Sequence, residues 1–481
     1  MNFYTKLFYI GIIYVTINKA IEMTTLAVSP LYFNCFRRNY KYLRNKLMIK
    51  RGPGIMIDKT KAYLQEKYRI NSKTLELYDI AIKDVQKEFE ILDEIREFNQ
   101  LKVLAALQEE RISDSHFTNS SGYGYVDIGR DSLDKVYARI FNCESALVRP
   151  HFVNGTHAIG AALFGNLRPN DTMLSVCGTP YDTLLNIIGI NVTEDIGSLK
   201  DYGVKYKQLE LNHNSKVDID LMKKTLLEDK SIKLVHIQRS TGYGWRKALL
   251  ICEIEEIIKA AKAINPKVIC FVDNCYGEFI DTEEPTEVGA DLVAGSLIKN
   301  IGGGIAPTGG YIAGKEEYVV QASYRLTTPG IGGECGSTFG VMRTLFQGLF
   351  LAPHVTMEAL KGAIFCARIM ELAGFEVLPK YTDKRSDIIQ AIKFNNKEKV
   401  VNFCRGIQEG SPIDSFVQCE PWDMPGYADQ VIMAAGAFIQ GSSIELSADA
   451  PIREPYIAYL QGGLTFDHAK IGILIALSRV I

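Results

Sequence analysis

Apolar and polar residues follow two distinct periods along most of this 481-residue chain. From about residue 72 to 110, apolar positions recur at steps of three and four, which predicts helices that form an N-terminal arm. Beyond residue 133, short apolar runs typical of buried strands alternate with segments of helical period. The predicted strands are 145–149, 172–176, 203–209, 232–237, 268–272, 292–296 and 310–313, and the clearest helical segments between them are 155–164, 219–227 and 254–263.

Strands that are apolar throughout and that alternate with helices indicate a mostly parallel sheet with helices on both faces. We therefore predict an α/β fold with a seven-stranded sheet in a large domain, residues 133–352. A long helical pattern over 353–373 leads into a smaller C-terminal α/β domain, 353–481, which includes segments 429–440 and 443–446 and a final helix from Asp467. The helical arm and a glycine-rich loop that follows it make up residues 56–132.

The first 55 residues differ from the rest. An apolar run over 7–17 lies between Lys6 and Lys19 and superficially resembles the charged and hydrophobic parts of a signal peptide. It is shorter than the roughly 20 apolar residues that span a bilayer. We expect the functional chain to begin near Met56, with the preceding residues either a mis-called start or a disordered arm. A peripheral membrane anchor is the alternative.

Composition and charge narrow the function. A hydrophobic content of 47% can build a large core, and a formal charge of -2 gives no field that would attract nucleic acid or an anionic membrane. The ten cysteines include no CxxC pair, and several lie in apolar runs, as reduced thiols of a cytoplasmic protein do. No cluster of His, Cys and carboxylates has metal-ligand spacing, so we expect no metal. These features favour a cytoplasmic protein that acts on a small molecule.

Two of the predicted strands end on reactive residues. Asp273 follows strand 268–272, and Lys299 follows strand 292–296 and precedes three glycines at 302–304. Ligands of such sheets bind at the carboxyl ends of the strands. A lysine and an acid at one edge suit pyridoxal phosphate, because the amine forms a Schiff base and the acid keeps the ring nitrogen protonated. The alternatives are a surface lysine and a helix-capping aspartate.

A possible phosphate site lies where the chain turns through Asn154 and Gly155 into a helix that begins with Thr156 and His157. Free backbone N–H groups at a helix start and the helix dipole both favour an anion. Such a turn alone is more often a simple helix entry. Together with Lys299, it favours a phosphate site.

Two more side chains are predicted to lie at the same edge of the sheet. Tyr181 follows strand 172–176 and could stack on an aromatic cofactor, which is worth about 1 kcal/mol beyond burial. It could equally be a turn tyrosine that covers the core. Ser296, three residues before Lys299, could donate a hydrogen bond to the phosphate, or it could be an ordinary strand-end serine.

In combination, these stretches resemble the aluminium-resistance or methionine gamma-lyase-like family, a branch of the Cys/Met-metabolism pyridoxal-phosphate enzymes with the aspartate-aminotransferase fold (fold type I). The resemblance covers nearly the whole chain from about Met56 to Ile481. The matching stretches are 122–130, 154–157, 178–183, 238–243, 273–278, 296–299 and 447–456.

The resemblance implies that Lys299 carries pyridoxal 5'-phosphate as a Schiff base and that Asp273 faces the ring nitrogen. Tyr181 would stack on the ring, and Gly155, Thr156 and Ser296 would bind the phosphate, with Asn154 and His157 in the same turn. One departure is Ile298, because relatives often carry a hydroxyl residue directly before the lysine. Arg239, Ser240 or the partner chain would then have to supply a donor.

The resemblance further implies active sites shared between subunits of a homodimer or homotetramer with twofold symmetry. Tyr125 and Arg130 match a tyrosine and an arginine that reach the phosphate site of a neighbouring subunit. Arg453 is our candidate for binding the carboxylate of a small amino-acid substrate, because a planar guanidinium can bind that group through two hydrogen bonds. A surface ion pair is the alternative for Arg453.

The implied activity is that of a carbon–sulfur lyase, which eliminates a thiol from the beta or gamma carbon of a sulfur amino acid and leaves ammonia and a 2-keto acid. Lys299, Asp273 and Tyr181 would be catalytic, and Lys299 would be the general base if burial and nearby cationic charge lower its pKa. An aminotransferase and an aldolase are the alternatives, as is a cofactor-binding protein without enzymatic activity that is linked to metal tolerance.

Overall fold

A computed structural model describes residues 53–190, 192, 194–424 and 429–481. The chain divides into two compact units, Met1–Arg69 and Ile70–Ile481. The described part of the first unit is the helix α3 (Pro53–Tyr68), in which the rings of Tyr63 and Tyr68 meet edge to face with their centroids 6.3 Å apart. The predicted extension, residues 1–55, lies almost wholly outside the described residues.

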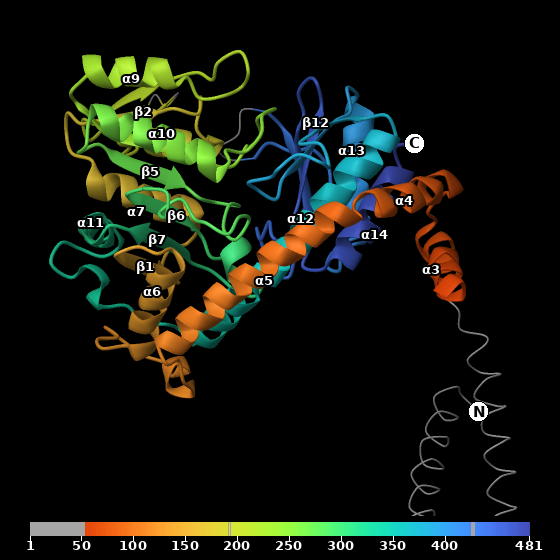
Figure 1. The fold of residues 1–481 in the computed structure, drawn as a ribbon, viewed down its shortest axis with the longest axis horizontal. Coiled ribbons are helices and arrows are strands. Elements are labelled where there is room, and N and C mark those ends of the chain that lie inside the picture. Colours follow the sequence, from red (N-terminus) through yellow and green to blue (C-terminus); the bar gives the residue numbers. More distant parts are fainter. Residues whose placement is uncertain (1–52, 191, 193, 425–428) are drawn as a thin grey trace, which may run out of the picture. The chain divides into compact units, whose positions relative to one another are not determined.

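The core of the second unit is a seven-stranded sheet (Figure 1). Along the sheet the strands follow the order β1-β7-β6-β5-β4-β2-β3, and only β7 runs antiparallel to its neighbours. The mostly parallel sheet of the prediction is therefore confirmed. The strands are β1 (Ser145–Arg149), β2 (Thr172–Ser175), β3 (Lys205–Gln208), β4 (Ile232–Gln238), β5 (Ile269–Asp273), β6 (Leu292–Ser296) and β7 (Gly310–Gly314).

Helices cover both faces of this sheet, because successive side chains of a strand point to opposite sides. From β5, Ile269 and Phe271 pack into a hydrophobic cluster with α7, α8 and α11, whereas Cys270 and Val272 pack into another with α5, α6, α9 and α10. This two-sided burial explains the continuous apolar runs. The helices are α5 (Gln86–Glu109), α6 (Ile128–Ile140), α7 (Gly155–Asn166), α8 (Asp182–Ile188), α9 (Ile219–Glu228), α10 (Ile251–Ile264) and α11 (Glu316–Leu326).

A long helix, α12 (Met342–Leu372), connects the large sheet with the C-terminal part of the chain and lies along α5 (Figure 1). It contacts the short helix η2 (Asn300–Gly302) beside Lys299, and further along it contacts β9 and β12 of the second sheet. Pro353, where we placed a domain boundary, lies inside this continuous helix. By length and composition α12 could cross a membrane, but most of that stretch is buried inside the molecule.

The C-terminal part contains a five-stranded antiparallel sheet with the order β10-β11-β12-β9-β8. The predicted segment 429–440 contains one short strand, 443–446 forms turns directly before β11, and the predicted final helix is observed. The elements are β8 (Glu376–Leu378), β9 (Gln390–Lys393), β10 (Val431–Ala434), β11 (Ser447–Pro451), β12 (Ile457–Gln461), α13 (Lys397–Glu409) and α14 (Phe466–Ser478), with α4 (Ser72–Asp84), η1 (Asp114–Phe117) and η3 (Gly332–Glu334) elsewhere in the unit.

A buried histidine in β4 makes the folded state sensitive to acid. His236 is 0% exposed, and neither ring nitrogen has a hydrogen-bond partner. Burial lowers the pKa of His236 from about 6.5 to about 4. Between these values the unfolded chain binds a proton that the folded chain does not, so stability falls as the pH decreases through this window.

The free energy of unfolding of the wild type should fall between pH 8 and pH 5, and burial of the neutral His236 should account for about 2 kcal/mol of this fall. We therefore expect the fall to be about 2 kcal/mol smaller in His236→Leu. Urea unfolding midpoints at the two pH values measure this loss. The matched control is His213→Gln, because His213 is exposed. An equal loss in the wild type and in His236→Leu would contradict the assignment.

Candidate active site

The structure brings together the lysine and the acid that the sequence singled out. Asp273 ends β5, Lys299 follows β6, and these strands are parallel neighbours. The Asp273 carboxylate accepts a hydrogen bond of 3.1 Å from the Cys275 backbone N–H. Lys299 Nζ lies 3.7 Å from the centre of the Tyr276 ring. The carboxyl edge of the sheet therefore brings the lysine and the acid together on neighbouring strands, with an aromatic ring beside the amine.

The groups around Lys299 decide the direction of its pKa shift. Burial by itself lowers the pKa of Lys299, but Tyr276, Cys275 and Asp273 outweigh it and raise the pKa above its usual value. Burial also raises the pKa of Tyr276, of Cys275 and of Asp273. The groups that raise the pKa of Lys299 here are acids, and the expectation for the lysine once the substrate amine has displaced it from the cofactor stays a prediction. Lys299 is held as an ammonium ion.

The three glycines after Lys299 let its loop pack closely against the protein. A side chain on Gly302 would place its Cβ 1.7 Å from the Leu297 carbonyl oxygen. Gly303, with a φ of +57°, lies against the Gly348 carbonyl of α12. These glycines allow close backbone packing, which fixes the lysine loop between β6 and α12.

The start of α7 presents unused backbone donors beside this loop. The Asn154 side chain caps the helix by accepting the His157 N–H at 2.8 Å. The N–H groups of Gly155 and Thr156 have no hydrogen-bond partner among the described residues. A Cβ on Gly155 would lie 3.1 Å from Ser296 Cβ, so these donors lie against the end of β6. The arrangement suits an anion.

Three hydroxyl groups surround the same point. Thr156 Oγ1 lies 3.0 Å from Thr183 Oγ1 in the first turn of α8, and Ser296 Oγ accepts the Ile298 N–H at 3.3 Å. Sequence analysis did not select Thr183, although it lies in the matching stretch 178–183. Thr183 can supply the donor that is missing at Ile298.

Arg239 and Ser240, which we considered for that missing donor, have other partners. Arg239 Nε donates to Ser386 Oγ at 3.0 Å, and its Nη1 donates to Asn274 at 2.8 Å. The Ser240 hydroxyl donates to Asp387 Oδ2 at 3.1 Å. Both residues therefore bind the segment that precedes β9 instead of the helix start.

The His157 side chain also turns away from the helix start. Its Nδ1 accepts the Val153 N–H at 3.2 Å, and its ring packs edge to face on Phe152 at 5.4 Å. Burial lowers the pKa of His157, so its ring is neutral at neutral pH. The structure thus uses the His157 backbone in the helix cap and its ring in local packing.

Tyr181 lies at the end of β4, one strand from Asp273. Its backbone N–H donates to Gln238 Oε1 at 2.8 Å, and Gln238 pairs in register with Asp273. The Tyr181 ring lies 5.9 Å from the ring of Tyr243, which in turn lies 5.2 Å from that of Tyr459. Three tyrosines therefore form an aromatic wall over this edge of the sheet.

The C-terminal part contributes a carboxylate that sequence analysis missed. Asp449 Oδ2 accepts hydrogen bonds from the Tyr243 hydroxyl at 3.3 Å and from Gln461 Nε2 at 3.0 Å. Burial raises the pKa of Asp449 to about 6, although the charge of Lys299 opposes this rise. An acid within the apolar strand β11 and inside the matching stretch 447–456 was the available signal.

Arg453 lies further out. Its side chain is 56% exposed, and its Nη1 binds Asp429 Oδ2 at 2.9 Å. The surface ion pair that we kept as the alternative is therefore present. Its charge still reaches Asp182 and Tyr459, so Arg453 lies near the outer side of the aromatic wall.

Tyr125 and Arg130 have different surroundings, although both were expected to reach a neighbouring subunit. Arg130, in the first turn of α6, is 1% exposed and donates to the carbonyls of Gly124, Gly336 and Glu334 at 2.7–3.2 Å. Its guanidinium therefore anchors the glycine-rich loop of its own chain. Tyr125 is 59% exposed, and its ring stacks on Tyr123 with a centroid separation of 5.5 Å.

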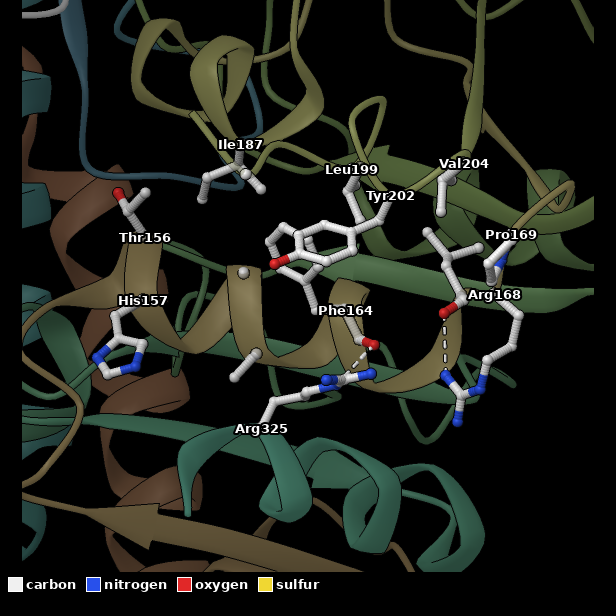
Figure 2. Close-up of a pocket in the computed structure, with 14 residues that line it drawn as sticks. Thr156, His157, Phe164, Arg168, Pro169, Ile187, Leu199, Tyr202, Val204 and Arg325 are labelled. Atoms are coloured by element: carbon white, nitrogen blue, oxygen red, sulfur yellow. Dashed lines mark hydrogen bonds between the residues drawn. The ribbon is translucent and has the colours of Figure 1, made fainter. Parts of the chain in front are cut away.

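A cavity of about 640 Å³ lies along the outer side of α7 (Figure 2). It begins at Thr156 and His157 and continues past Phe164 towards Arg168 and Arg325. Each of these arginines donates to a backbone carbonyl at the C-terminal end of α7. Neither Lys299 nor Asp273 lines this cavity, so it adjoins the helix start without enclosing the reactive residues.

Metal chemistry has no ligand set in the part of the chain that the structure describes. Within residues 53–190, 192, 194–424 and 429–481, no three His, Cys, Asp or Glu side chains gather where they could hold an ion.

Comparisons with known proteins agree with this geometry. The methionine gamma-lyase family model matches residues 74–481. An uncharacterised protein YnbB of Bacillus subtilis is 50% identical over 409 residues, which cover 85% of this chain and 96% of that protein. The crystal structure of a carbon–sulfur lyase involved in aluminium resistance from Clostridium novyi is 72% identical, has a TM-score of 0.85, and covers 88% of this chain and 99% of that one. The pyridoxal-5'-phosphate dependent protein YhfS of Escherichia coli shares the fold at 14% identity, with a TM-score of 0.54 over 80% of this chain and 95% of that one.

Proposed function

Because this chain belongs to the methionine gamma-lyase family, we propose that it is a pyridoxal-phosphate-dependent carbon–sulfur lyase. It acts on a sulfur-containing amino acid and releases a thiol, ammonia and a 2-keto acid. The observation that carries the proposal is the pairing of Lys299 with Asp273 at the ends of adjacent strands, beside a helix start with two unused N–H groups.

The residues present fit pyridoxal phosphate. A buried acid, Asp273, suits the ring nitrogen, and the donors of Gly155 and Thr156 suit the phosphate. When bound, the cofactor supplies an electron sink for negative charge on the substrate's alpha carbon. Asp273 would hold a proton at the ring nitrogen, and Tyr181 would cover one face of the ring.

Lys299 would hold the cofactor through Nζ and, once displaced by the substrate amine, would move the proton of the alpha carbon. In the structure Tyr276, Cys275 and Asp273 together raise the pKa of Lys299. To act as a base, the lysine would have to lose its proton when the cofactor binds. The hydroxyl groups of Thr156, Thr183 and Ser296 would orient the phosphate.

The working unit in this proposal is a cytoplasmic homodimer or homotetramer with shared sites. Tyr123, Tyr125 and Val126 are 71%, 59% and 83% exposed at the tip of the glycine-rich loop, and apolar side chains so exposed favour a second subunit as their partner. Arg130 would position this loop from within its own chain. The described cysteines are all free thiols, as in a reducing compartment.

The proposal is tested by incubating the purified protein, loaded with pyridoxal phosphate, with a panel of sulfur and hydroxyl amino acids. Thiol, ammonia and keto acid are assayed together, and the lyase yields them in equal amounts. An aminotransferase would instead leave pyridoxamine phosphate without free ammonia, and an aldolase would release glycine. A protein that binds the cofactor but forms no product from any of these amino acids would refute the proposal that it is an enzyme.

Gly155→Ala is expected to raise the dissociation constant of pyridoxal phosphate about tenfold. This change corresponds to the free energy of about one hydrogen bond to a charged group. The added Cβ would lie 3.1 Å from Ser296 Cβ and 3.4 Å from Cys275 Sγ, so the helix start must move away from the strands. The dissociation constant is measured by absorbance titration of the apoprotein.

The matched control for this variant is Gly160→Ala, in the same helix. Its Cβ would meet only the flexible end of Ile187, at 3.2 Å. Equal affinities for the two alanine variants would contradict the assignment of the phosphate to the start of α7.

A further inference from the structure

Only one of the two carboxylate oxygens of Asp449 accepts hydrogen bonds from the described residues. Both of its hydrogen bonds, from Tyr243 and Gln461, end on Oδ2, and Oδ1 accepts none among the described residues. Asp449 is partly exposed, although its strand neighbours Ala448 and Ala450 are fully buried. The two donors hold the carboxylate in one orientation, with Oδ1 free for a further donor.

The position of Asp449 links it to the substrate. Tyr243, which binds it, comes from the large sheet and lies beside Tyr181, and the charge of Lys299 acts on Asp449 directly. Tyr276 and Cys404 also lie within electrostatic reach. Tyr276 also joins the two sides, because its ring lies beside Lys299 Nζ and its hydroxyl donates to Ser443 Oγ of the C-terminal part at 2.9 Å. Asp449 therefore lies near Lys299 on the C-terminal side of the site.

Among the groups that act on Asp449, Lys299 is the cation. In the proposed enzyme Lys299 is committed to the cofactor, which leaves Asp449 without a positive partner. The alpha-carboxylate of a substrate would be repelled here. An alkyl chain would strip water from the carboxylate without replacing its hydrogen bonds, which is costly for a buried charge.

We propose that Asp449 binds a cationic ammonium group on the departing half of the substrate, so that the enzyme selects sulfur amino acids whose leaving thiol carries an amine. This inference rests on the proposed lyase function. Tyr243 and Gln461 position the carboxylate, and Oδ1 accepts the N–H of the ammonium.

Two isosteric substrates test the inference. S-(2-aminoethyl)-L-cysteine ends in an ammonium group, and S-propyl-L-cysteine ends in a methyl group of the same size. At pH 8 we expect the wild type to cleave the first with a kcat/KM roughly 30-fold higher than the second, the scale of a desolvated charge pair. In Asp449→Asn this ratio should fall to about one, while S-propyl-L-cysteine is still cleaved.

Further variants separate recognition from folding. Tyr243→Phe removes one of the two positioning hydrogen bonds and should lower the ratio partially. Asp467→Asn changes an 84% exposed carboxylate of the same part of the chain and should leave the ratio unchanged. In the wild type the preference should grow as the pH rises through about 6, where Asp449 becomes charged, and should be independent of pH in Asp449→Asn.

Several outcomes overturn the inference. One is a wild type without preference, and another is a preference that survives in Asp449→Asn. An equal loss of both activities in that variant also overturns it, because Asp449 would then serve Lys299 or the fold.

If neither substrate yields thiol, the lyase function itself fails, and binding decides the inference alone. L-Lysine and L-2-aminoheptanoate, which have no leaving group, are then compared by calorimetry with the cofactor-loaded protein. Tighter binding of lysine to the wild type, lost in Asp449→Asn, supports the ammonium site, and equal binding refutes it.

Discussion

Replacing Lys299 by alanine is expected to slow thiol release by about 10⁴-fold, the upper range for a lost acid–base group. The variant removes both the amine that would hold the cofactor and the group that would move the alpha proton. It also leaves the buried Asp273 without its cation. Initial rates of thiol release measure the loss, and borohydride reduction followed by peptide mass analysis locates the attachment site.

Lys299→Arg separates charge from covalent chemistry. The guanidinium retains a positive charge near Tyr276 and Asp273, but it does not form an imine, so we expect no recovery of activity. Lys259→Ala is the matched control, because Lys259 is 69% exposed on α10. Borohydride labelling of another lysine, or turnover by Lys299→Ala, would contradict the central assignment.

The large sheet could be predicted from the sequence because helices cover both of its faces. Strands β1 and β6 have the predicted bounds, since a strand buried on both sides is mostly apolar along its length. The bounds of the helices were harder to predict. The helical pattern predicts a long helix over 353–373, whereas α12 begins at Met342 and runs through Pro353. Buried neighbours such as Leu349 and Ala352 hold the helix together across the proline.

The reactive residues divide in a similar way. Lys299, Asp273 and Gly155 were predicted from local patterns. The first two are reactive residues after apolar strands, and Gly155 lies in a turn that begins a helix. Asp449 and Thr183 were missed, because only tertiary packing brings them to the same edge.

The orientation of side chains was also beyond the sequence. Arg130 has the residue type and the motif of a group that reaches another subunit, but three carbonyls of its own chain occupy its guanidinium. The pKa of Lys299 is a similar case, because its direction depends on which groups gather around the amine. Tyr276, Cys275 and Asp273 outweigh burial there, and the lysine itself reveals none of them.

Asp273→Asn is expected to lower kcat/KM for thiol release by roughly 10²- to 10³-fold, the scale of one lost electrostatic group in an active site. Asparagine has the size of aspartate and can still accept the Cys275 N–H, but it carries no charge to hold a proton on the ring nitrogen. Removing this acid also lowers the pKa of Lys299, since Asp273 contributes to raising it. Steady-state kinetics measure the loss of activity, and the absorbance of the bound cofactor as a function of pH measures the change in its protonation.

The control for Asp273→Asn is Asp220→Asn, because Asp220 is exposed on α9. Borohydride should still attach the cofactor to Lys299 in Asp273→Asn, because the amine and the start of α7 are untouched. Retained cofactor with lost turnover would show that Asp273 acts through its charge. Loss of the cofactor altogether would instead make it a binding residue, and unchanged kinetics would exclude it from the chemistry, because no other change of shape accompanies the substitution.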